Sequence, residues 1–174
     1  MVRHRQELEE FCSAAYPRLV RALALHCGDR HLAEDLAQEA LIRACRHWRR
    51  VRTLQSPIGW AYRAGANLST SQARRRAAED RALRRVADQQ GREWGLRDLD
   101  LTMDVADALS QLSDSHRAVV LLRYQLGLSA TEAAETLNST PAAVRALTHR
   151  ALVALRVHLD FDAEDLQPEA RHVP

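Results

Sequence analysis

The sequence predicts an all-α protein made of two small helical domains joined by a flexible linker. Apolar residues recur at helical spacing over most of the chain, and glycine and proline are few. The sequence shows no segment with the alternation and turn residues of a β-hairpin. In the C-terminal part, two short helical segments flank a tight turn, which predicts a helix-turn-helix. A chain of 174 residues is long enough for two domains of this kind.

The first domain is expected to cover residues 1–85 and to begin with a helix over 5–26 that ends at Gly28. A second helix, 31–48, is the most clearly amphipathic segment of the chain. Its predicted buried stripe consists of Leu32, Leu36, Ala40, Leu41, Ala44, Cys45 and Trp48. Ile42 falls on the opposite, polar face, where it is either a partner contact or an ordinary surface residue.

A short basic loop, 49–55, leads into the third helix of this domain. Ser56 and Pro57 supply an N-cap and a first-turn proline, so the helix is expected to run over 58–76. Its inward positions are Ile58, Ala61, Tyr62, Gly65 and Leu68. Trp60 lies on the other side and has two interpretations, a ring that stacks on a nucleic-acid base and a core aromatic at a helix start.

Residues 77–100 lose helical periodicity, and the part over 86–100, which contains two glycines among alternating charges, is predicted to be a linker. The second domain is expected over 101–159. Apolar residues restart a helix at Leu101, and Ser113 is placed to cap the next one. Residues 160–174 form an acidic tail.

The helix-turn-helix prediction depends on local capping signals. Ser129 and Glu132 form a capping-box pattern, and Asn138 is suited to the left-handed conformation that ends a helix. Thr140 and Pro141 then open a second helix. The apolar positions of that helix are Val144, Leu147, Ala151 and Leu155. An ordinary helical hairpin is the alternative, because a DNA-binding helix pair has no strict sequence signature.

The distribution of charge favours a nucleic-acid partner. All 25 basic residues are arginine, and the net charge is only +2. Residues 43–85 carry 12 Arg and 2 acids, a net charge of +10, whereas residues 1–42 carry −2 and residues 86–174 carry −6. A solvated helix face is the alternative explanation for a run of charges. Twelve arginines against two acids exceed what solubility needs, and arginine pairs well with phosphate.

Residue patterns of enzymes and metal proteins are missing from the sequence. It contains neither a phosphate-binding glycine loop nor an HExxH motif, so we expect no catalytic residues, no metal and no cofactor. Cys12, Cys27 and Cys45 are scattered singly, and their spacing suggests neither a zinc site nor a redox pair. The longest apolar runs are too short to span a membrane, and no signal peptide is recognised. We therefore expect a cytoplasmic protein.

Five stretches together resemble a known family. They are YPRLVRALA (16–24), AEDLAQEALIRACRHW (33–48), GWAYRAGANL with the following ARRR (59–68 and 73–76), ALSQLSDSHRAVVLLRYQLGLS (108–129) and TPAAVRALTHRALVALR (140–156). This pattern resembles the extracytoplasmic-function class of bacterial RNA polymerase sigma factors. The resemblance implies a two-domain protein that directs core RNA polymerase to promoters through −10 and −35 elements, with regions 2 and 4 as its domains.

The resemblance also implies three sets of site residues. The polymerase-docking set, which would meet the β′ clamp, is Asp35, Gln38, Glu39, Ile42 and Arg43. The set for the −10 element is Arg49, Arg52, Thr53, Trp60, Arg63, Asn67, Ser71, Arg74 and Arg75. The set for the −35 element is Thr140, Ala142, Ala143, Arg145, Ala146, His149 and Arg150. The β flap of the polymerase and an anti-sigma factor are further implied partners.

The chain departs from the family in its last predicted helix. Ala146 and Leu147 stand where relatives often carry a polar or basic pair, and Thr148 stands where an apolar residue is usual. We therefore expect either a rotated helix or a changed −35 preference.

Three rival functions fit the sequence less well. A ligand-responsive regulator would need a pocket domain in the first hundred residues, which instead hold a basic helix with a polar face. An anti-sigma factor or adaptor that binds only proteins does not explain the +10 block. A nuclease would need paired carboxylates near that block. Binding to core RNA polymerase and promoter-dependent initiation would separate these classes.

Overall fold

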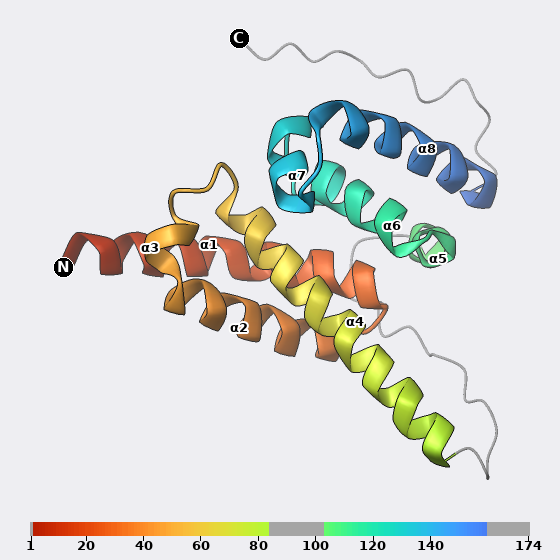
Figure 1. Cartoon of the computed structure of the whole chain (residues 1–174), viewed down its shortest axis with the longest axis horizontal. Helices are drawn as coiled ribbons and strands as arrows, with labels where there is room; N and C mark the ends of the chain where they lie inside the picture. The colour runs from red at the N-terminus through yellow and green to blue at the C-terminus, as the bar shows by residue number, and fades with distance from the viewer. Residues whose placement is uncertain (1, 84–102, 160–174) are drawn as a thin grey trace.

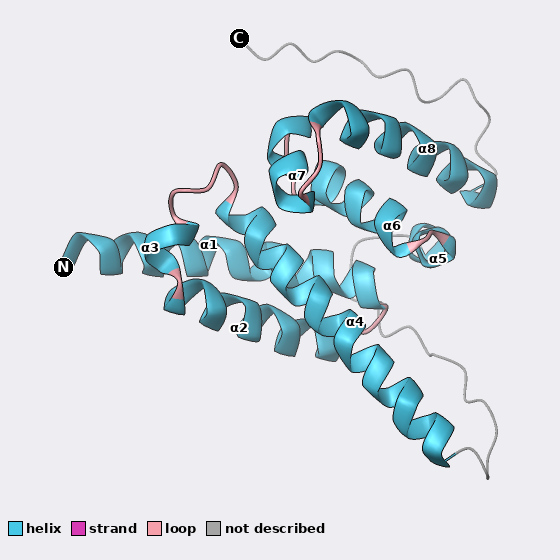
Figure 2. Ribbon diagram, viewed as in Figure 1, coloured by secondary structure: helices cyan, strands magenta, loops and turns pink. Residues whose placement is uncertain are grey.

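The computed structural model describes residues 2–83 and 103–159, and these residues form helices joined by short connections (Figure 2). The elements are α1 (Val2–Cys27), α2 (Arg30–Arg46), α3 (Trp48–Val51), α4 (Pro57–Leu83), α5 (Met103–Gln111), α6 (Asp114–Val120), η1 (Leu121–Gln125), α7 (Ala130–Leu137) and α8 (Pro141–Leu159). The all-α prediction is therefore confirmed for the described residues. The predicted linker, 86–100, and the predicted acidic tail, 160–174, lie outside them.

The first domain is built from α1, α2 and α4, which pack along one another (Figure 1). Leu19 and Leu23 of α1, Leu36 of α2 and Tyr62 of α4 are almost completely buried. Their helical spacing places one apolar stripe of each helix toward the same core. Gly65 of α4 allows a close crossing, because a Cβ at this position would lie 2.7 Å from a methyl carbon of Leu23.

Local signals set the breaks at Gly28 and Ser56 as predicted, whereas α4 continues to Leu83, past its predicted end at residue 76. Gly28 has a φ of +74°, which glycine adopts easily, and it separates α1 from α2. Asp29 caps α2 by accepting a hydrogen bond of 2.9 Å from the Leu32 amide. The buried Ser56 hydroxyl accepts from the Gly59 amide at 3.1 Å and caps α4 in the same way. These side chains pair main-chain donors that the first turn leaves without partners.

Two details of the second helix differ from the prediction. The helix ends at Arg46, and Trp48 begins the separate short helix α3, so part of the predicted loop 49–55 is helical. Trp48 packs against Phe11 of α1, with ring centroids 5.0 Å apart. Cys45, predicted to be buried, is exposed. The core beneath this part of α2 is occupied by Ala44, so the neighbouring sulfur lies at the edge of the contact with α1.

The second domain packs α6 and α7 against the long helix α8. Its buried apolar side chains include Leu109, Leu112, Val119, Leu121, Leu122, Leu126, Leu128, Ala133, Ala134, Val144 and Ala151. The segment after Val120 is a π-helix rather than an α-helix. Its wider turn bonds the Leu126 amide to the Leu121 carbonyl at 2.9 Å. Gly127, at a φ of +68°, then leads the chain toward α7.

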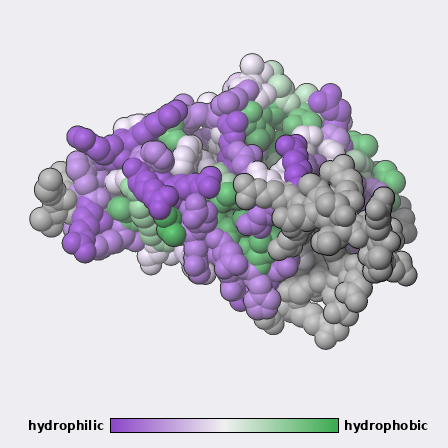
Figure 3. Space-filling model, turned by 60° about the horizontal axis from the view of Figure 1, so that its bottom comes forward, coloured by the Kyte–Doolittle hydropathy of each residue, from purple (hydrophilic) through white to green (hydrophobic). Residues whose placement is uncertain are grey.

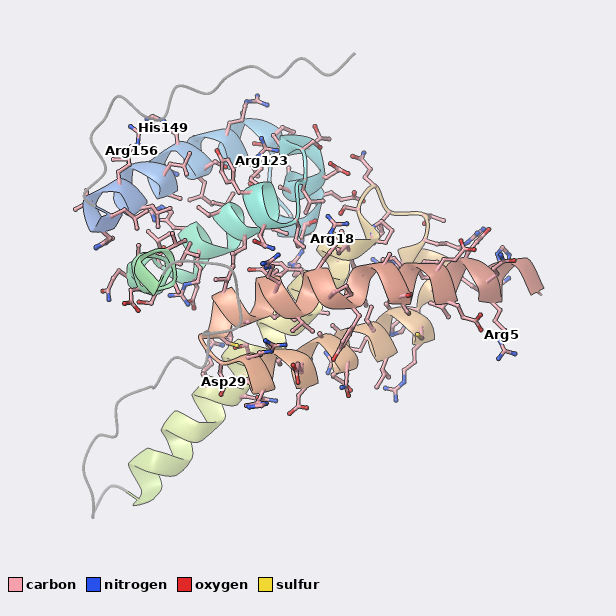
Figure 4. All side chains as sticks on the ribbon, turned by 180° about the vertical axis from the view of Figure 1, so that it is seen from behind. Arg5, Arg18, Asp29, Arg123, His149 and Arg156 are labelled. Atoms are coloured by element: carbon pink, nitrogen blue, oxygen red, sulfur yellow. The ribbon has the colours of Figure 1, made fainter. Side chains whose placement is uncertain are left out.

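The two domains pack against each other in the described structure. Helix α1 contacts α5, α6 and η1, and helix α4 contacts α7. Arg18 of α1 reaches toward the second domain (Figure 4) and donates from Nη2 to the Leu126 carbonyl at 2.7 Å. In the other direction, Arg117 of α6 donates from Nη1 to the His26 carbonyl at 2.7 Å. The sequence predicted two helical domains, but it did not predict this contact between them.

Candidate nucleic-acid and polymerase interface

The predicted polymerase-docking residues share the outer face of α2. Asp35, Gln38 and Ile42 are exposed, and the Ile42 residue is 45 % accessible. Glu39 and Arg43 are half-exposed and form an ion pair of 2.9 Å between Oε1 and Nε. The opposite face holds the buried residues Leu36, Ala37, Ala40, Leu41 and Ala44. Figure 3, which turns the lower side of Figure 1 toward the viewer, shows mainly hydrophilic side chains with small hydrophobic areas between them.

The short segment between α2 and α4 holds the first residues of the predicted −10 set. Arg49, Arg52 and Thr53 are exposed. Arg52 Nη1 pairs with Glu7 Oε2 of α1 at 2.9 Å, and the Thr53 hydroxyl donates to the Arg50 carbonyl at 2.8 Å. The hydrogen bond from His4, with that from Arg52, lowers the pKa of the Glu7 carboxyl. These contacts hold the segment against the start of α1.

The outer face of α4 presents most of the remaining −10 set. Asn67, Ser71 and Arg74 are exposed along one side of the helix, as the helical spacing predicted. The Ser71 hydroxyl donates to the Asn67 carbonyl at 2.9 Å, so it is paired within the helix. Arg75 belongs to α4, but its side chain lies outside the described residues.

Trp60 combines features of both sequence interpretations. Its side chain is half-buried and packs against the apolar core, yet it also lines a cavity at the surface. His47, at the end of α2, meets the Trp60 ring edge-on with centroids 6.5 Å apart. The ring is therefore held in place and still has solvent-accessible area.

Helix α7 of the second domain lies over the first turns of α4. Arg63, a predicted −10 residue, donates from Nη1 to the Thr136 carbonyl of α7 at 2.7 Å. The Gln55 amide donates to Glu135 Oε2 at 3.2 Å. A Cβ at Gly59 would lie 2.4 Å from Thr136 Oγ1, so the helices meet where α4 has no side chain. The predicted −10 surface is thus partly occupied by the second domain.

A cavity of about 620 Å³ lies between the domains beside this contact. From the first domain it is lined by Arg43, His47, Arg50, Leu54, Ser56, Trp60, Arg63, Ala64 and Asn67, and from α7 and the turn after it by Glu135, Thr136 and Asn138. The arginines of the first domain give this cavity a basic wall. His47 and Arg50 were not among the predicted site residues, although Arg50 belongs to the basic run that the sequence showed.

The first domain contains a buried titratable pair beside its contact with α6. His26 Nδ1 and the Tyr62 hydroxyl lie 3.1 Å apart in a hydrogen bond. Burial, with the nearby Arg117 guanidinium, lowers the pKa of His26 to about 4. Burial raises the pKa of Tyr62 well above its usual range. Both groups are therefore neutral at physiological pH, which suits a structural role.

The helix pair α7 and α8 has the capping pattern that the sequence predicted. Ser129 accepts from the Glu132 amide at 3.2 Å, and Glu132 Oε2 accepts from the Ser129 amide at 2.7 Å, a complete capping box. Asn138 is left-handed at a φ of 50° and ends α7. The Thr140 hydroxyl accepts from the Ala143 amide at 3.2 Å and caps α8.

The predicted −35 residues lie together on the outside of this pair. Those on α8 are all exposed, namely Ala142, Ala143, Arg145, Ala146, His149 and Arg150. His149 points away from α6 (Figure 4). Thr148 is buried between Val144 and Ala151, and its hydroxyl donates to the Val144 carbonyl at 2.7 Å. Because that hydrogen bond pairs the hydroxyl, Thr148 can occupy a position that faces the core. The neighbouring Leu147, which was predicted to face inward, is only half-buried.

Comparisons with known proteins assign the two domains. Residues 12–79 match the family model for Sigma-70 region 2, and residues 102–155 match the model for Sigma-70, region 4. A solved structure of the sigma factor RpoE from Bartonella quintana, in complex with the anti-sigma factor NepR, has a similar fold. Its TM-score is 0.75 at 22 % identity, covering 90 % of this chain and 99 % of that one. Two helical domains with these matches define a protein of the sigma-70 type.

Curated relatives narrow the assignment. The ECF RNA polymerase sigma factor SigL of Mycobacterium tuberculosis is 34 % identical over 138 residues, 76 % of this chain and 77 % of that protein. The RNA polymerase sigma-E factor of Streptomyces avermitilis is 29 % identical, covering 95 % and 93 %. SigW of Bacillus subtilis is 30 % identical, covering 76 % and 78 %. The chain belongs to the extracytoplasmic-function (ECF) family of RNA polymerase sigma factors.

This membership settles the general function. The chain is an alternative sigma factor that directs promoter-specific transcription initiation, and proteins of this class bind core RNA polymerase and promoter DNA. The family is not an enzyme family. Among the described residues, no helix is long and apolar enough to cross a membrane.

Proposed function

We propose that the chain docks on core RNA polymerase through the exposed face of α2. The observation that carries this assignment is Ile42, an exposed large apolar side chain within an otherwise polar helix face. Interfaces place such a side chain at their centre and surround it with polar groups. Here the polar groups around Ile42 are Asp35, Gln38 and the Glu39–Arg43 ion pair. The partner surface is the clamp of the β′ subunit.

The outer face of α4 and the segment before it bind the −10 element as an opened strand. The exposed side chains of Arg49, Asn67 and Arg74 supply charge and an amide, and the Trp60 ring supplies a surface for a base. The opened strand exposes both phosphates and base faces, which this mixture of side chains suits. Because α7 covers Arg63 in the described arrangement, strand loading requires α7 to leave α4.

Helix α8 binds the −35 element as duplex DNA. In a helix-turn-helix the second helix enters the major groove, and the exposed side chains of its first turns meet base edges. Ala142, Ala143 and Ala146 allow close approach of the helix, whereas Arg145, His149 and Arg150 supply donors. The buried Thr148 keeps these residues outward, so the departures from the family pattern change the −35 preference. The same domain contacts the β flap.

The chain acts in the cytoplasm, without catalytic activity and without a cofactor of its own, as a subunit of the polymerase. Its domains divide at 1–85 and 101–159, with 86–100 as the connecting linker and 160–174 as a tail. An anti-sigma factor is its expected negative regulator, by analogy with the complex of RpoE and NepR.

The test is reconstitution. Purified chain and core polymerase are combined on a genomic promoter library, and transcript starts are sequenced, with core polymerase alone as the control. Starts that share one −10 and one −35 motif at fixed spacing support the proposal. Tight, sequence-specific duplex binding by the isolated chain would instead support a ligand-responsive regulator. If the chain binds core polymerase but no specific transcript starts appear, the result would support an adaptor that binds only proteins.

A further inference from the structure

Two cysteines that are far apart in the sequence meet in the first domain. Cys12 of α1 and Cys45 of α2 are 33 residues apart along the chain, and their sulfur atoms lie 3.9 Å apart. Sulfur atoms in a disulfide are about 2.05 Å apart. Both residues belong to helices that pack against each other, so a change of side-chain torsions together with a small shift of the last turn of α2 joins them. The spacing of the cysteines along the chain did not predict this proximity.

The environments of the two thiols differ. Cys45 is exposed, whereas Cys12 is partly buried. Burial, with the hydrogen bond to Cys45, raises the pKa of Cys12 to about 11, so this thiol stays protonated at neutral pH. Cys45 is therefore the sulfur that a dissolved oxidant reaches first. Cys27 is separate from the pair, at the far end of α1, where its thiol donates to the Asp29 carbonyl at 3.2 Å.

We propose that Cys12 and Cys45 form a reversible disulfide when a hydroperoxide oxidises the protein, and that this bond weakens docking on core RNA polymerase. In the first step the Cys45 thiolate attacks the peroxide oxygen, giving Cys45 sulfenic acid and, from hydrogen peroxide, water after protonation. In the second step the Cys12 sulfur displaces the sulfenic oxygen, which leaves as a second water. Two thiols are oxidised and one peroxide is reduced. A dithiol reductant reverses the bond by exchange.

The location of Cys45 on α2 explains why the disulfide would weaken docking on core RNA polymerase. Cys45 follows Ile42 by three residues and Gln38 by seven, a spacing that places the three side chains on one face of α2. All three are exposed. A bond to Cys12 draws the last turn of α2 toward α1, beside the packed rings of Phe11 and Trp48. This effect on docking rests on the proposed docking face, whereas formation of the bond does not.

The bond itself is tested by mass spectrometry on the full chain. Reduced protein is treated with hydrogen peroxide, quenched with catalase, alkylated and digested without reductant. We expect a peptide pair linked through Cys12 and Cys45 that disappears after dithiothreitol. Cys27→Ser should retain the linked pair, and Cys12→Ser and Cys45→Ser should lose it. A linked pair that contains Cys27, a covalent dimer through Cys45, or alkylation of all three thiols after peroxide would overturn the proposal.

The effect on docking is tested with the same quenched protein and untreated core polymerase. Oxidised wild type should bind several-fold more weakly than reduced wild type, and dithiothreitol should restore binding. Cys12→Ser is the control, because it leaves α2 intact and should bind equally before and after peroxide. If the bond forms and affinity stays the same while Glu39→Arg weakens binding, the regulatory effect is wrong and the docking face stands. If neither change alters affinity, the docking face is wrong.

Discussion

Arg63 of α4 donates a hydrogen bond of 2.7 Å to the main-chain carbonyl of Thr136 on α7. The contact joins the helix proposed to hold the opened −10 strand to the first helix of the helix-turn-helix. A guanidinium group held in this way by a carbonyl is not presented to a phosphate. The described arrangement and the proposed binding of the strand by Arg63 therefore exclude each other, so the proposal requires the two domains to separate during initiation.

Gly59→Ala tests this contact between the domains. The new Cβ would lie 2.4 Å from Thr136 Oγ1 and 3.0 Å from Ser56 Oγ, so it opposes the approach of α7. We expect the contact to weaken by about 1–3 kcal/mol, the usual cost of overpacking. The helix α4 itself should become slightly more stable, because alanine favours helix more than glycine does. Small-angle X-ray scattering of the isolated chain should show a larger radius of gyration.

The matched control for this variant is the double variant that carries both Gly59→Ala and Thr136→Ala. Removing Oγ1 removes the closest contact, so the double variant should regain much of the compact radius. A radius that stays at the wild-type value in Gly59→Ala would show that the domains do not hold this arrangement in solution.

Glu39→Arg tests the docking face. The substitution replaces the Glu39–Arg43 ion pair with two like charges, which costs folding only a few tenths of a kcal/mol at an exposed helical site. Binding to core polymerase should weaken by about 2 kcal/mol if this face is an energetic centre of the interface. Glu10→Arg, on the exposed side of α1, is the matched charge reversal outside the face. Equal affinities for the two variants would remove α2 from the docking assignment.

Arg145→Ala and Asn67→Ala test the proposed division of work between α8 and α4 in binding DNA. Arg145 is exposed on α8, and its loss should cost about 1–3 kcal/mol if it makes a bidentate base contact in the duplex. Asn67→Ala on α4 should leave closed-complex binding nearly intact and slow strand opening. Each variant is assayed on a duplex promoter and on one with a pre-melted −10 bubble. The bubble should rescue Asn67→Ala only, and equal rescue of both variants would contradict the assignment.

The buried His26 predicts how stability depends on pH. Its pKa is lowered from 6.5 to about 4 in the folded protein, so the unfolded chain binds more protons between these values. Stability is therefore fully present above pH 6.5 and falls as the pH drops toward 4. Through His26, the free energy of unfolding should fall by about 3 kcal/mol over this range, at 1.36 kcal/mol for each unit of pKa difference. Urea unfolding of wild type and His26→Asn across this range checks it, and parallel curves for the two proteins would contradict it.

Much of the candidate site follows from local patterns in the sequence. Ser129 and Glu132 form the predicted capping box, and Asn138 ends α7 in the predicted left-handed conformation. Most of the predicted residues on α2, α4 and α8 are exposed, because helical periodicity separates an inner from an outer face, whereas Trp60 and Arg63 are partly covered. The prediction of the buried stripe of α2 failed at the end of the helix. Cys45 and Trp48 were assigned to one buried stripe, but the helix ends at Arg46, before Trp48 begins α3.

What the sequence by itself determined is therefore the set of helices, their caps and their polar faces. These features depend on residues within a few positions of one another, and each is encoded by spacing and side-chain type. Only the tertiary structure decided that Arg63 meets Thr136, which is 73 residues further along the chain, and that Cys12 meets Cys45. Such contacts depend on how whole helices cross and pack, and a local pattern specifies which face is buried without specifying which helix buries it.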